Sequence, residues 1–317
     1  MALGNKSIGR DLYKKPLKER IVSDLKRNWI VYLMVLPVVA WYIIFCYAPM
    51  YGVTMAFQNY KASKGFFGSD WIGFKNFTDF FNDVYFWRII KNTLRISLLS
   101  LFVGWPAPIF LALLINECKN KYFVKSVQTI TYLPHFISLV VICGMIKSFT
   151  GTNGIITNII EGITGNNQSI LTMPQAFPWI YVISTVWQEV GWGSIIYLSA
   201  LSAIDQELYE ACEIDGGGRW RQTIHVTIPG ILPTIITLLI LKMGSLLSVG
   251  YEKIILLYNE STMETAEVIS SYVYKRGLID SDFSYATAIG LFNSLINIFF
   301  IVSTNAISRR VSETSLW

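Results

Sequence analysis

Long apolar stretches alternate with shorter polar ones along most of this chain. About 20 consecutive apolar residues are needed for a helix to cross roughly 30 Å of hydrocarbon. The pattern predicts six such spans, at residues 29–49, 89–115, 124–149, 178–201, 234–257 and 284–307. The predicted fold class is therefore an all-α integral membrane protein with six transmembrane helices.

Composition supports a membrane protein and argues against a metal centre. Of the 317 residues, 53% are hydrophobic and only 15% are charged, whereas a soluble domain carries about a quarter charged residues. The cysteines are scattered and form no CxxC pair, so we predict neither a disulfide framework nor a metal site. They are Cys46, Cys118, Cys143 and Cys212.

Basic residues next to the spans indicate the orientation, because loops rich in Lys and Arg stay in the cytoplasm. Eight Lys or Arg residues lie in the polar segment 1–28, which predicts cytoplasmic N- and C-termini. Five basic residues oppose this orientation: Arg88, Lys91, Arg95, Lys275 and Arg276. Segment 1–28 is too long for a signal peptide, so the first span is a retained anchor. Its apolar residues predict either a helix along the membrane surface or a solvated tail; they are Leu12, Leu17, Ile21 and Leu25.

The insert at 205–232 is polar between two apolar spans. Residues 205–214 favour a short helix, glycines 216–218 permit a reversal, and residues 220–226 can start a second helix. Pro229 and Pro233 then end this element and start the fifth span. The pattern predicts a cytoplasmic helix-turn-helix, and an ordinary polar loop is the alternative.

The insert resembles the signature of permease subunits of bacterial ATP-binding-cassette importers. That signature is Glu-Ala-Ala, three residues, Gly, nine residues, Ile, one residue and Leu-Pro. The match is Glu210, Ala211, Cys212, Gly216, Val226, Ile228 and Pro229, with Cys, Val and Ile replacing Ala, Ile and Leu. Segments 71–81, 87–99 and 127–138 are similar to sugar permeases of this family.

The resemblance implies a coupling helix that docks on a separate ATPase. The implied coupling residues are Glu210, Ala211, Asp215, Gly216, Arg219, Trp220 and Pro229. The chain has no Gly-Lys dipeptide and so no phosphate loop of the type GxxxxGK[ST]. ATP and Mg²⁺ therefore belong to the partner ATPase, no cofactor is expected on this chain, and no catalytic residue is assigned.

The resemblance also implies the domain organisation and the partners. We expect a cytoplasmic segment 1–28, a first span 29–49, an extracytoplasmic loop 50–88, a permease core 89–307 and a cytoplasmic tail 308–317. Further expected partners are a second, unequal permease, giving a heterodimer, an extracytoplasmic solute-binding protein, a carbohydrate substrate and membrane lipid, but no nucleic acid. The binding protein is expected to dock on the outer segments 50–87, 151–177 and 258–283. The expected location is the bacterial cytoplasmic membrane.

Polar and aromatic residues near the bilayer midplane are candidates for the substrate pathway, because polar side chains there face cavities or other helices. The candidates are His135, Trp187, Gln188, Glu189, Trp192, Lys242, Asn293 and Asn297. Helix packing is the alternative role, with Gly191 and Gly193 at close approaches and Glu189 paired to a cation such as Lys242.

Three other functions stay open from the residues. An ATP-driven permease for a non-sugar solute has the same architecture. An ATP-independent transporter or channel would work without an ATPase. A membrane glycosyl or lipid transferase could use the acidic group in the insert to hold Mg²⁺; that group is Asp205, Glu210, Glu213 and Asp215.

Overall fold

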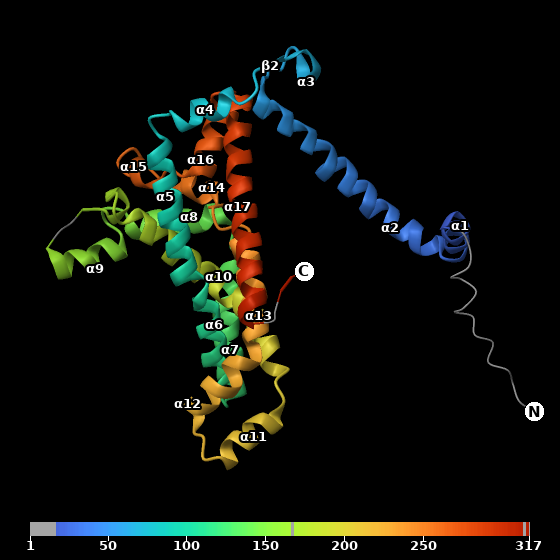
Figure 1. Ribbon diagram of the computed structural model, residues 1–317. Coiled ribbons are helices and arrows are strands. Elements are labelled where there is room, and N and C mark those ends of the chain that lie inside the picture. Colours follow the sequence, from blue (N-terminus) through green and yellow to red (C-terminus); the bar gives the residue numbers. More distant parts are fainter. Residues whose placement is uncertain (1–16, 166–167, 313–314, 317) are drawn as a thin grey trace, which may run out of the picture. The chain divides into compact units, whose positions relative to one another are not determined.

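Helices make up nearly all the regular structure of the chain. The computed structural model describes residues 17–165, 168–312 and 315–316, and its strands are two residues each (Figure 1). The all-α class predicted from the apolar pattern is confirmed. The chain divides into two compact units, residues 1–54 and 55–317.

The first unit contains the apolar helix nearest the N-terminus. Its elements are α1 (Leu17–Arg27), α2 (Trp29–Trp41), the π-helical turn η2 (Tyr42–Tyr47) and most of the 3-10 segment η3 (Ala48–Phe57). Asp24 connects α1 to α2, because its carboxylate accepts from Asn28 Nδ2 at 2.7 Å and from Tyr32 Oη at 2.5 Å. The helix predicted at Leu17, Ile21 and Leu25 is present as α1, while Leu12 lies outside the described residues.

The first apolar helix is longer than predicted. It runs without interruption from Trp29 to Phe57, so the segment expected to begin a loop at residue 50 is still helical. Pro49 does not stop it, because it occupies the second position of η3, where a missing N–H costs little. No side chain in the apolar window of this helix is buried.

The second unit begins with a small cap. Strands β1 (Gln58–Asn59) and β2 (Asp70–Trp71) pair antiparallel, flanking α3 (Gly65–Gly68). Helix α4 (Lys75–Phe81) closes the cap, because Asn76 Nδ2 donates to the Ala56 carbonyl at 2.9 Å. Segment 50–88 is thus an ordered structure rather than an irregular loop.

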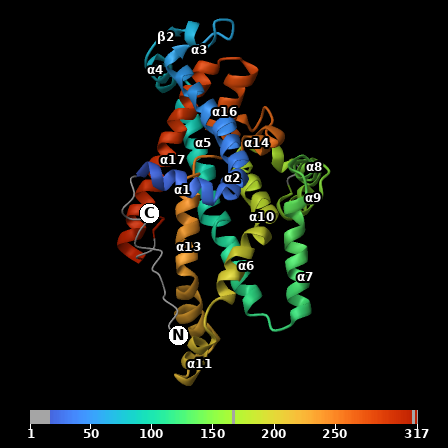
Figure 2. The same cartoon turned by 90° about the vertical axis from the view of Figure 1, so that its right-hand side faces the viewer.

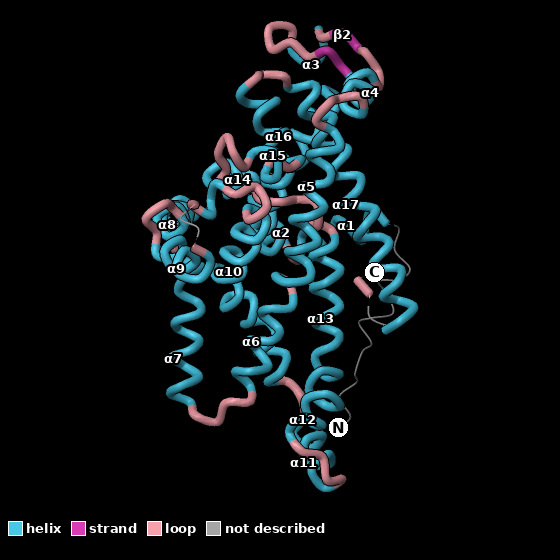
Figure 3. The backbone as a smooth tube through the Cα atoms, turned by 90° about the vertical axis from the view of Figure 1, so that its left-hand side faces the viewer, coloured by secondary structure: helices cyan, strands magenta, loops and turns pink. Residues whose placement is uncertain are grey.

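Long helices form the body of the second unit. Figure 2 shows α6, α10 and α13 running between its two ends, and in Figures 1 and 3 α4 and β2 lie at one end and α11 and α12 at the other. The remaining elements, in chain order, are α5 (Phe86–Leu99), η4 (Ser100–Gly104), α6 (Pro106–Asn116), α7 (Lys121–Tyr132), η5 (Leu133–Phe136), α8 (Leu139–Thr150), α9 (Ile155–Thr164), η6 (Ile170–Thr172), α10 (Phe177–Ser202), α11 (Gln206–Ile214), α12 (Arg219–Gln222), η7 (Thr223–Thr227), α13 (Ile228–Met243), α14 (Tyr251–Leu257), α15 (Met263–Ala266), α16 (Ile269–Tyr274), η8 (Lys275–Ile279) and α17 (Phe283–Ser312).

Two predicted spans have different boundaries in the structure. The predicted helix at 124–149 is broken at Ile137 and Ser138, because Pro134 interrupts it and Ser138 caps the next helix, α8. The predicted fifth span, 234–257, begins and ends at later residues than the helix in the structure. A continuous helical stretch runs from Arg219 to Met243, and α14 is a separate helix.

Five helical stretches of the described chain are long and apolar enough to cross a membrane. They are Trp29–Phe57, Phe86–Asn116, Leu139–Ile163, Arg219–Met243 and Phe283–Arg310. Helix α10 is 26 residues long, but its polar residues lower its mean hydropathy, and it is not among the five. Six spans therefore remain a prediction.

A half-buried carboxylate ties the α4–α5 turn to α16 and α17. Asp83 accepts hydrogen bonds from Tyr285 Oη at 2.6 Å, Tyr272 Oη at 2.7 Å and the Tyr85 N–H at 2.9 Å. Burial alone raises the pKa of Asp83, but the hydrogen bonds from Tyr285, Tyr85 and Tyr272 outweigh it and leave that pKa below its ordinary value. The ionised carboxylate therefore holds this end of the unit together.

Candidate functional site

The polar insert forms the helix-turn-helix predicted from its sequence. Helix α11 starts at the N-cap Asp205, whose Oδ1 accepts from the Glu207 N–H at 3.0 Å. This cap satisfies one of the backbone donors that a helix start leaves free. Helix α12 then runs back towards α13, so the insert protrudes from one end of the second unit (Figure 3).

The glycines have different tasks in the turn. Gly216 has φ +77°, a left-handed conformation that suits glycine, and its N–H donates to the Glu213 carbonyl at 2.9 Å. The Gly217 N–H donates to the Cys212 carbonyl at 2.8 Å, which completes a Schellman cap. A Cβ on Gly217 would lie 2.7 Å from the Cys212 carbonyl oxygen, whereas one on Gly218 would meet open space.

The insert is rigidly joined to the helices above it. Tyr209 Oη and Thr227 Oγ1 are hydrogen-bonded at 3.1 Å, which connects α11 to η7. Tyr209 and Val226 also pack on a buried apolar cluster formed by Ala112, Tyr197, Leu201, Ile204 and Ile231. The insert therefore packs directly against α6, α10 and α13.

The prolines of the insert do not separate it from the following helix, contrary to the sequence prediction. Pro229 lies in the first turn of α13, directly after the π-helical turn η7, and the helix is not broken there. Pro233 lies inside α13, and the helical stretch continues through it to Met243. The second half of the insert and the apolar helix are thus one continuous element, stiffer than a hinged pair.

The outward surface of the insert combines charged and apolar side chains. Ile214 and Trp220 are 87% and 77% exposed, although both are large and apolar. All seven predicted coupling residues are exposed: Glu210, Ala211, Asp215, Gly216, Arg219, Trp220 and Pro229. Exposed aromatic and apolar groups rimmed by charge are typical of a protein-docking surface.

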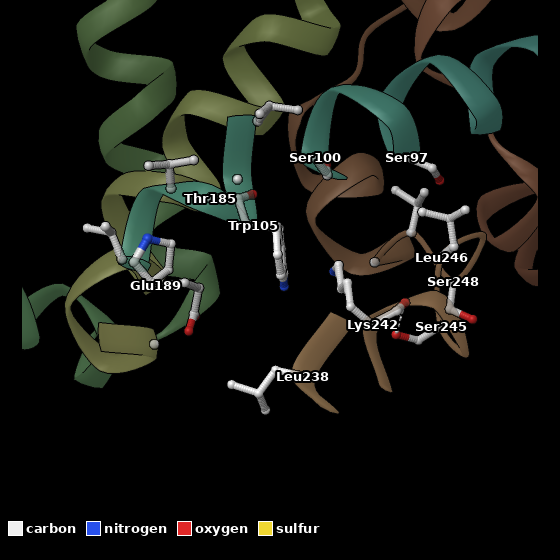
Figure 4. Close-up of a pocket in the computed structure, with 18 of the residues that line it drawn as sticks. Ser97, Ser100, Trp105, Thr185, Glu189, Leu238, Lys242, Ser245, Leu246 and Ser248 are labelled. Atoms are coloured by element: carbon white, nitrogen blue, oxygen red, sulfur yellow. Dashed lines mark hydrogen bonds between the residues drawn. The ribbon is translucent and has the colours of Figure 1, made fainter. Parts of the chain in front are cut away.

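A polar cavity of about 520 Å³ lies among α5, η4, α6, α10, α13 and the segment after α13. Figure 4 shows hydroxyls, an indole, a carboxylate and an ammonium group around it. Ser97 Oγ and Trp105 Nε1 are buried without a hydrogen-bond partner among the described residues. Buried polar atoms normally have partners, so these two atoms are exceptions next to the cavity, and neither is open to solvent.

A break in the helix builds one wall of this cavity. Helix α13 ends at Met243, and α14 starts only at Tyr251. Asn297 of α17 supports the break, since its Oδ1 accepts from the Leu247 N–H at 3.1 Å and its Nδ2 donates to Ser248 Oγ at 3.1 Å. Irregular backbone within a membrane is tolerated where it is buried in protein or lines a cavity, and such broken helices form many transporter sites.

The comparison with known proteins places the chain in a family. A family model described as "Binding-protein-dependent transport system inner membrane component" matches residues 104–313. The chain belongs to this family. It is a multi-span permease subunit of a bacterial ABC importer, not an enzyme, and the ATPase is a separate subunit. The resemblance read from residues 210–229 is therefore confirmed at the level of the family.

Two curated relatives align along almost the whole permease. One is protein LplB of Bacillus subtilis (strain 168), 40% identical over 297 residues that cover 93% of each chain. Another is the polygalacturonan/rhamnogalacturonan transport system permease protein YteP of the same organism, 38% identical over 307 residues that cover 96% of each chain.

Two solved structures share the fold of the permease. One is a bacterial ABC transporter involved in the import of the acidic polysaccharide alginate, with 44% identity, a TM-score of 0.85 and coverage of 92% of this chain and 99% of that one. The other is a bacterial alginate ABC transporter in complex with an alginate pentasaccharide-bound periplasmic protein. It has 43% identity, a TM-score of 0.87 and coverage of 94% and 100%.

Three of the predicted pathway residues of the permease lie together. His135 Nδ1 lies 2.9 Å from Glu189 Oε2, and the His135 ring stacks on Trp192 with centroids 4.5 Å apart. Glu189 thus pairs with His135, not with Lys242 as the packing alternative suggested. Of these three side chains, only Glu189 lines the polar cavity.

The other predicted pathway residues are dispersed. Lys242 lines the polar cavity, whereas Trp187 lines a separate apolar cavity of about 530 Å³ next to α8. Gln188 and Asn293 are not part of the polar lining, and Asn297 supports the broken helix from behind.

The glycines of α10 confirm the packing alternative at one position. A Cβ on Gly191 would lie 2.1 Å from the Thr131 carbonyl oxygen, so α7 and α10 meet there at backbone distance. Gly193 contacts Pro108 of α6 and lines the polar cavity as well. One helix therefore packs with one face and borders the cavity with another.

Sequence reasoning missed most of the cavity lining. The missed polar and aromatic residues are Ser97, Ser100, Trp105, Tyr181, Thr185, Tyr197, Ser245 and Ser248. They come from several helices, and each lies in an apolar run where a lone hydroxyl looks unremarkable. A tryptophan between Gly104 and Pro106 was the one available signal, because small and helix-breaking neighbours often mark a cavity wall.

The acidic group of the insert has no metal-binding arrangement. Asp205 is used as the helix cap of α11. Within residues 17–165, 168–312 and 315–316, no group of three His, Cys, Asp or Glu side chains has the spacing to hold a metal ion.

Proposed function

We propose that this permease moves an oligosaccharide or polysaccharide fragment inward across the bacterial cytoplasmic membrane, with both termini on the cytoplasmic side. Its relatives include a permease named for polygalacturonan and rhamnogalacturonan transport and the transporter of alginate import. Their identity with this chain extends over almost its full length, which supports a cargo of the same general class.

The polar cavity is the observation that carries the proposal. It combines serine and threonine hydroxyls with Trp105 and two tyrosines, Tyr181 and Tyr197, in about 520 Å³. Sugars offer many hydroxyls for hydrogen bonds and apolar C–H faces for aromatic rings, so this mixture matches their chemistry. Trp105 lines the cavity and offers an aromatic ring to those C–H faces.

We propose that the insert couples this cavity to an ATPase. Glu210 and Arg219 would pair with charges on the ATPase, and Trp220 would fill an apolar pocket there. The helical continuity from Arg219 to Met243 supports this role, because it connects the docking surface to Lys242 at the cavity wall.

The proposed assembly contains four kinds of subunit. The permease would pair with a second permease of different sequence, because the helices of one subunit form only half of the transmembrane pathway. An ATPase dimer with ATP and Mg²⁺ would bind the insert, and a solute-binding protein would dock at the opposite end of the unit. The alginate transporter crystallised with its periplasmic protein supports this arrangement.

The substrate class is tested in proteoliposomes. The permease is reconstituted with the second permease, ATPase and binding protein from its gene neighbourhood, and ATP hydrolysis is measured with candidate oligosaccharides. We expect a carbohydrate to stimulate hydrolysis, with sugar appearing inside the vesicles. Stimulation by an amino acid or a phosphate ester and by no carbohydrate would contradict the substrate class. Uptake without any ATPase would contradict the ATP-driven mechanism.

The coupling role is tested on the insert itself. In the same assembly, Glu210→Arg reverses a docking charge and Gly216→Pro removes the left-handed turn. We expect both variants to lose ATPase binding and transport. Full-rate transport by both would show that the insert does not dock the ATPase.

A further inference from the structure

Lys242 is a charged residue at the end of the apolar helical stretch Arg219–Met243 of the permease. It lies in the last turn of α13, and Gly244 just beyond it packs on Ile301, near the midpoint of α17. Its side chain is exposed and lines the polar cavity. Charge within an apolar helical stretch is costly, so an ionisable residue there is a functional-site hypothesis by default.

No carboxylate of the described residues forms an ion pair with Lys242. Glu189 is the one acidic residue in the cavity lining, and it pairs with His135. Figure 4 shows Glu189 and Lys242 on opposite sides of the Trp105 ring. The ammonium group is therefore available to an anion that enters the cavity.

A second cation lies behind the cavity wall. Lys253 of α14 is 5% exposed, and its Nζ donates to Thr185 Oγ1 at 2.8 Å. Thr185 lines the cavity, and Lys253 has no ion pair with any described residue. Two lysines and one His-paired carboxylate give the cavity an excess of positive charge, which favours anions in this poorly screened site.

We propose that Lys242 recognises carboxylate groups on the cargo, so that the permease selects acidic oligosaccharides built from uronic acids over neutral ones. This inference rests on the proposed carbohydrate function. The hydroxyls and Trp105 bind the uncharged parts of each sugar, and Lys242 binds the acid group. A lysine suits passage, because its three donors rotate with a moving carboxylate, whereas the planar arginine fork would hold it in one geometry.

The test compares one acidic oligosaccharide with its carboxyl-reduced, neutral counterpart in the reconstituted assembly. Uptake into vesicles is measured for the wild type, Lys242→Met and Lys242→Arg. We expect Lys242→Met to slow uptake of the acidic sugar about tenfold or more, the loss of one charge-assisted contact. Uptake of the neutral sugar should not fall, and Lys242→Arg should retain most of the preference.

The matched control is Lys147→Met, the same substitution at an exposed lysine of α8 outside the cavity lining. The inference would be overturned if Lys242→Met slowed uptake of both sugars equally or slowed uptake of neither. It would also be overturned if the variant assembly lost the second permease during purification. If the binding protein retains only the acidic sugar, the comparison uses uptake of that sugar alone. Slow uptake by Lys242→Met with rapid uptake by Lys242→Arg supports the inference. Equal uptake rates for the two variants overturn it.

This result is distinguishable from failure of the proposed function. If no carbohydrate stimulates ATP hydrolysis by the wild-type assembly, the carbohydrate function fails before any variant is compared. A second case is that neutral and acidic sugars both stimulate ATP hydrolysis by the wild type while Lys242→Met slows the uptake of both equally. In that case only the proposed selection by charge fails.

Discussion

The insert and the polar cavity of the permease are built in opposite ways. The insert is contiguous in sequence, from Asp205 to Pro229, and its caps and turn are made by neighbouring residues. The cavity is assembled from separate helices, and its walls join residues as distant as Ser97 and Gly250. One region is specified locally and the other only by tertiary packing.

The insert and the polar cavity also have different physical requirements. The proposed docking role requires a stiff insert that presents exposed groups such as Trp220 to another protein. The proposed cargo role requires a cavity that presents hydroxyls and aromatic rings to a solute. The proposed docking surface and the cavity wall therefore lie at different places on one continuous helical stretch, from Arg219 to Met243.

The largest expected effect concerns the exposed tryptophan of the insert. Trp220→Ala removes a 77% exposed indole from the proposed docking surface. A buried interface tryptophan is worth about 2 kcal/mol or more, so the affinity of the ATPase for the permease pair should fall about 30-fold. Binding of labelled ATPase to the pair in nanodiscs measures this effect. Trp71→Ala is the control, at a 65% exposed residue of the cap, and unchanged affinity in the Trp220 variant would count against docking there.

A smaller effect is expected in the turn of the insert. Gly217→Ala places a Cβ 2.7 Å from the Cys212 carbonyl oxygen, which forces a backbone shift costing about 1–3 kcal/mol. ATPase binding should weaken, and the same nanodisc assay measures it. Gly218→Ala is the matched control, since its Cβ meets open space and its φ is −74°. Equal behaviour of the two variants would mean that the turn geometry is not required.

The smallest effect is expected behind the cavity. Asn297→Leu removes two hydrogen bonds to the broken helix and leaves the Leu247 N–H without its acceptor, at a cost of about 1–2 kcal/mol. Thermal unfolding of the purified permease should shift downwards. Asn293→Leu, one helical turn away, is the control, because Asn293 Oδ1 has no partner among the described residues. A larger loss in the Asn293 variant would contradict the supporting role of Asn297.

The sequence was informative where structure depends on neighbours. The signature spacing, the short helix at residues 205–214 and the glycine turn were recognised, because such elements are determined by residues close in sequence. The continuity through Pro229 and Pro233 was not predicted, because proline usually breaks or kinks a helix, whereas here the helical stretch runs through both.

The cavity could be predicted only in part. Glu189 and Lys242 were recognised because charge within an apolar run is unusual. Their partners were not, since the pairing of Glu189 with His135 depends on how η5 packs against α10. Ser97, Thr185 and Ser248 carry no local signal, because an isolated hydroxyl in an apolar helix more often bonds to its own backbone.

Photo-crosslinking from two tryptophan positions tests the central claim most directly. A photoreactive amino acid replaces Trp220 or Trp71 in the complete assembly, and the covalent products are identified by mass. The account predicts that position 220 crosslinks to the ATPase and that position 71, at the other end of the second unit, does not. A product between position 220 and the binding protein, or an ATPase product from position 71 alone, would contradict it.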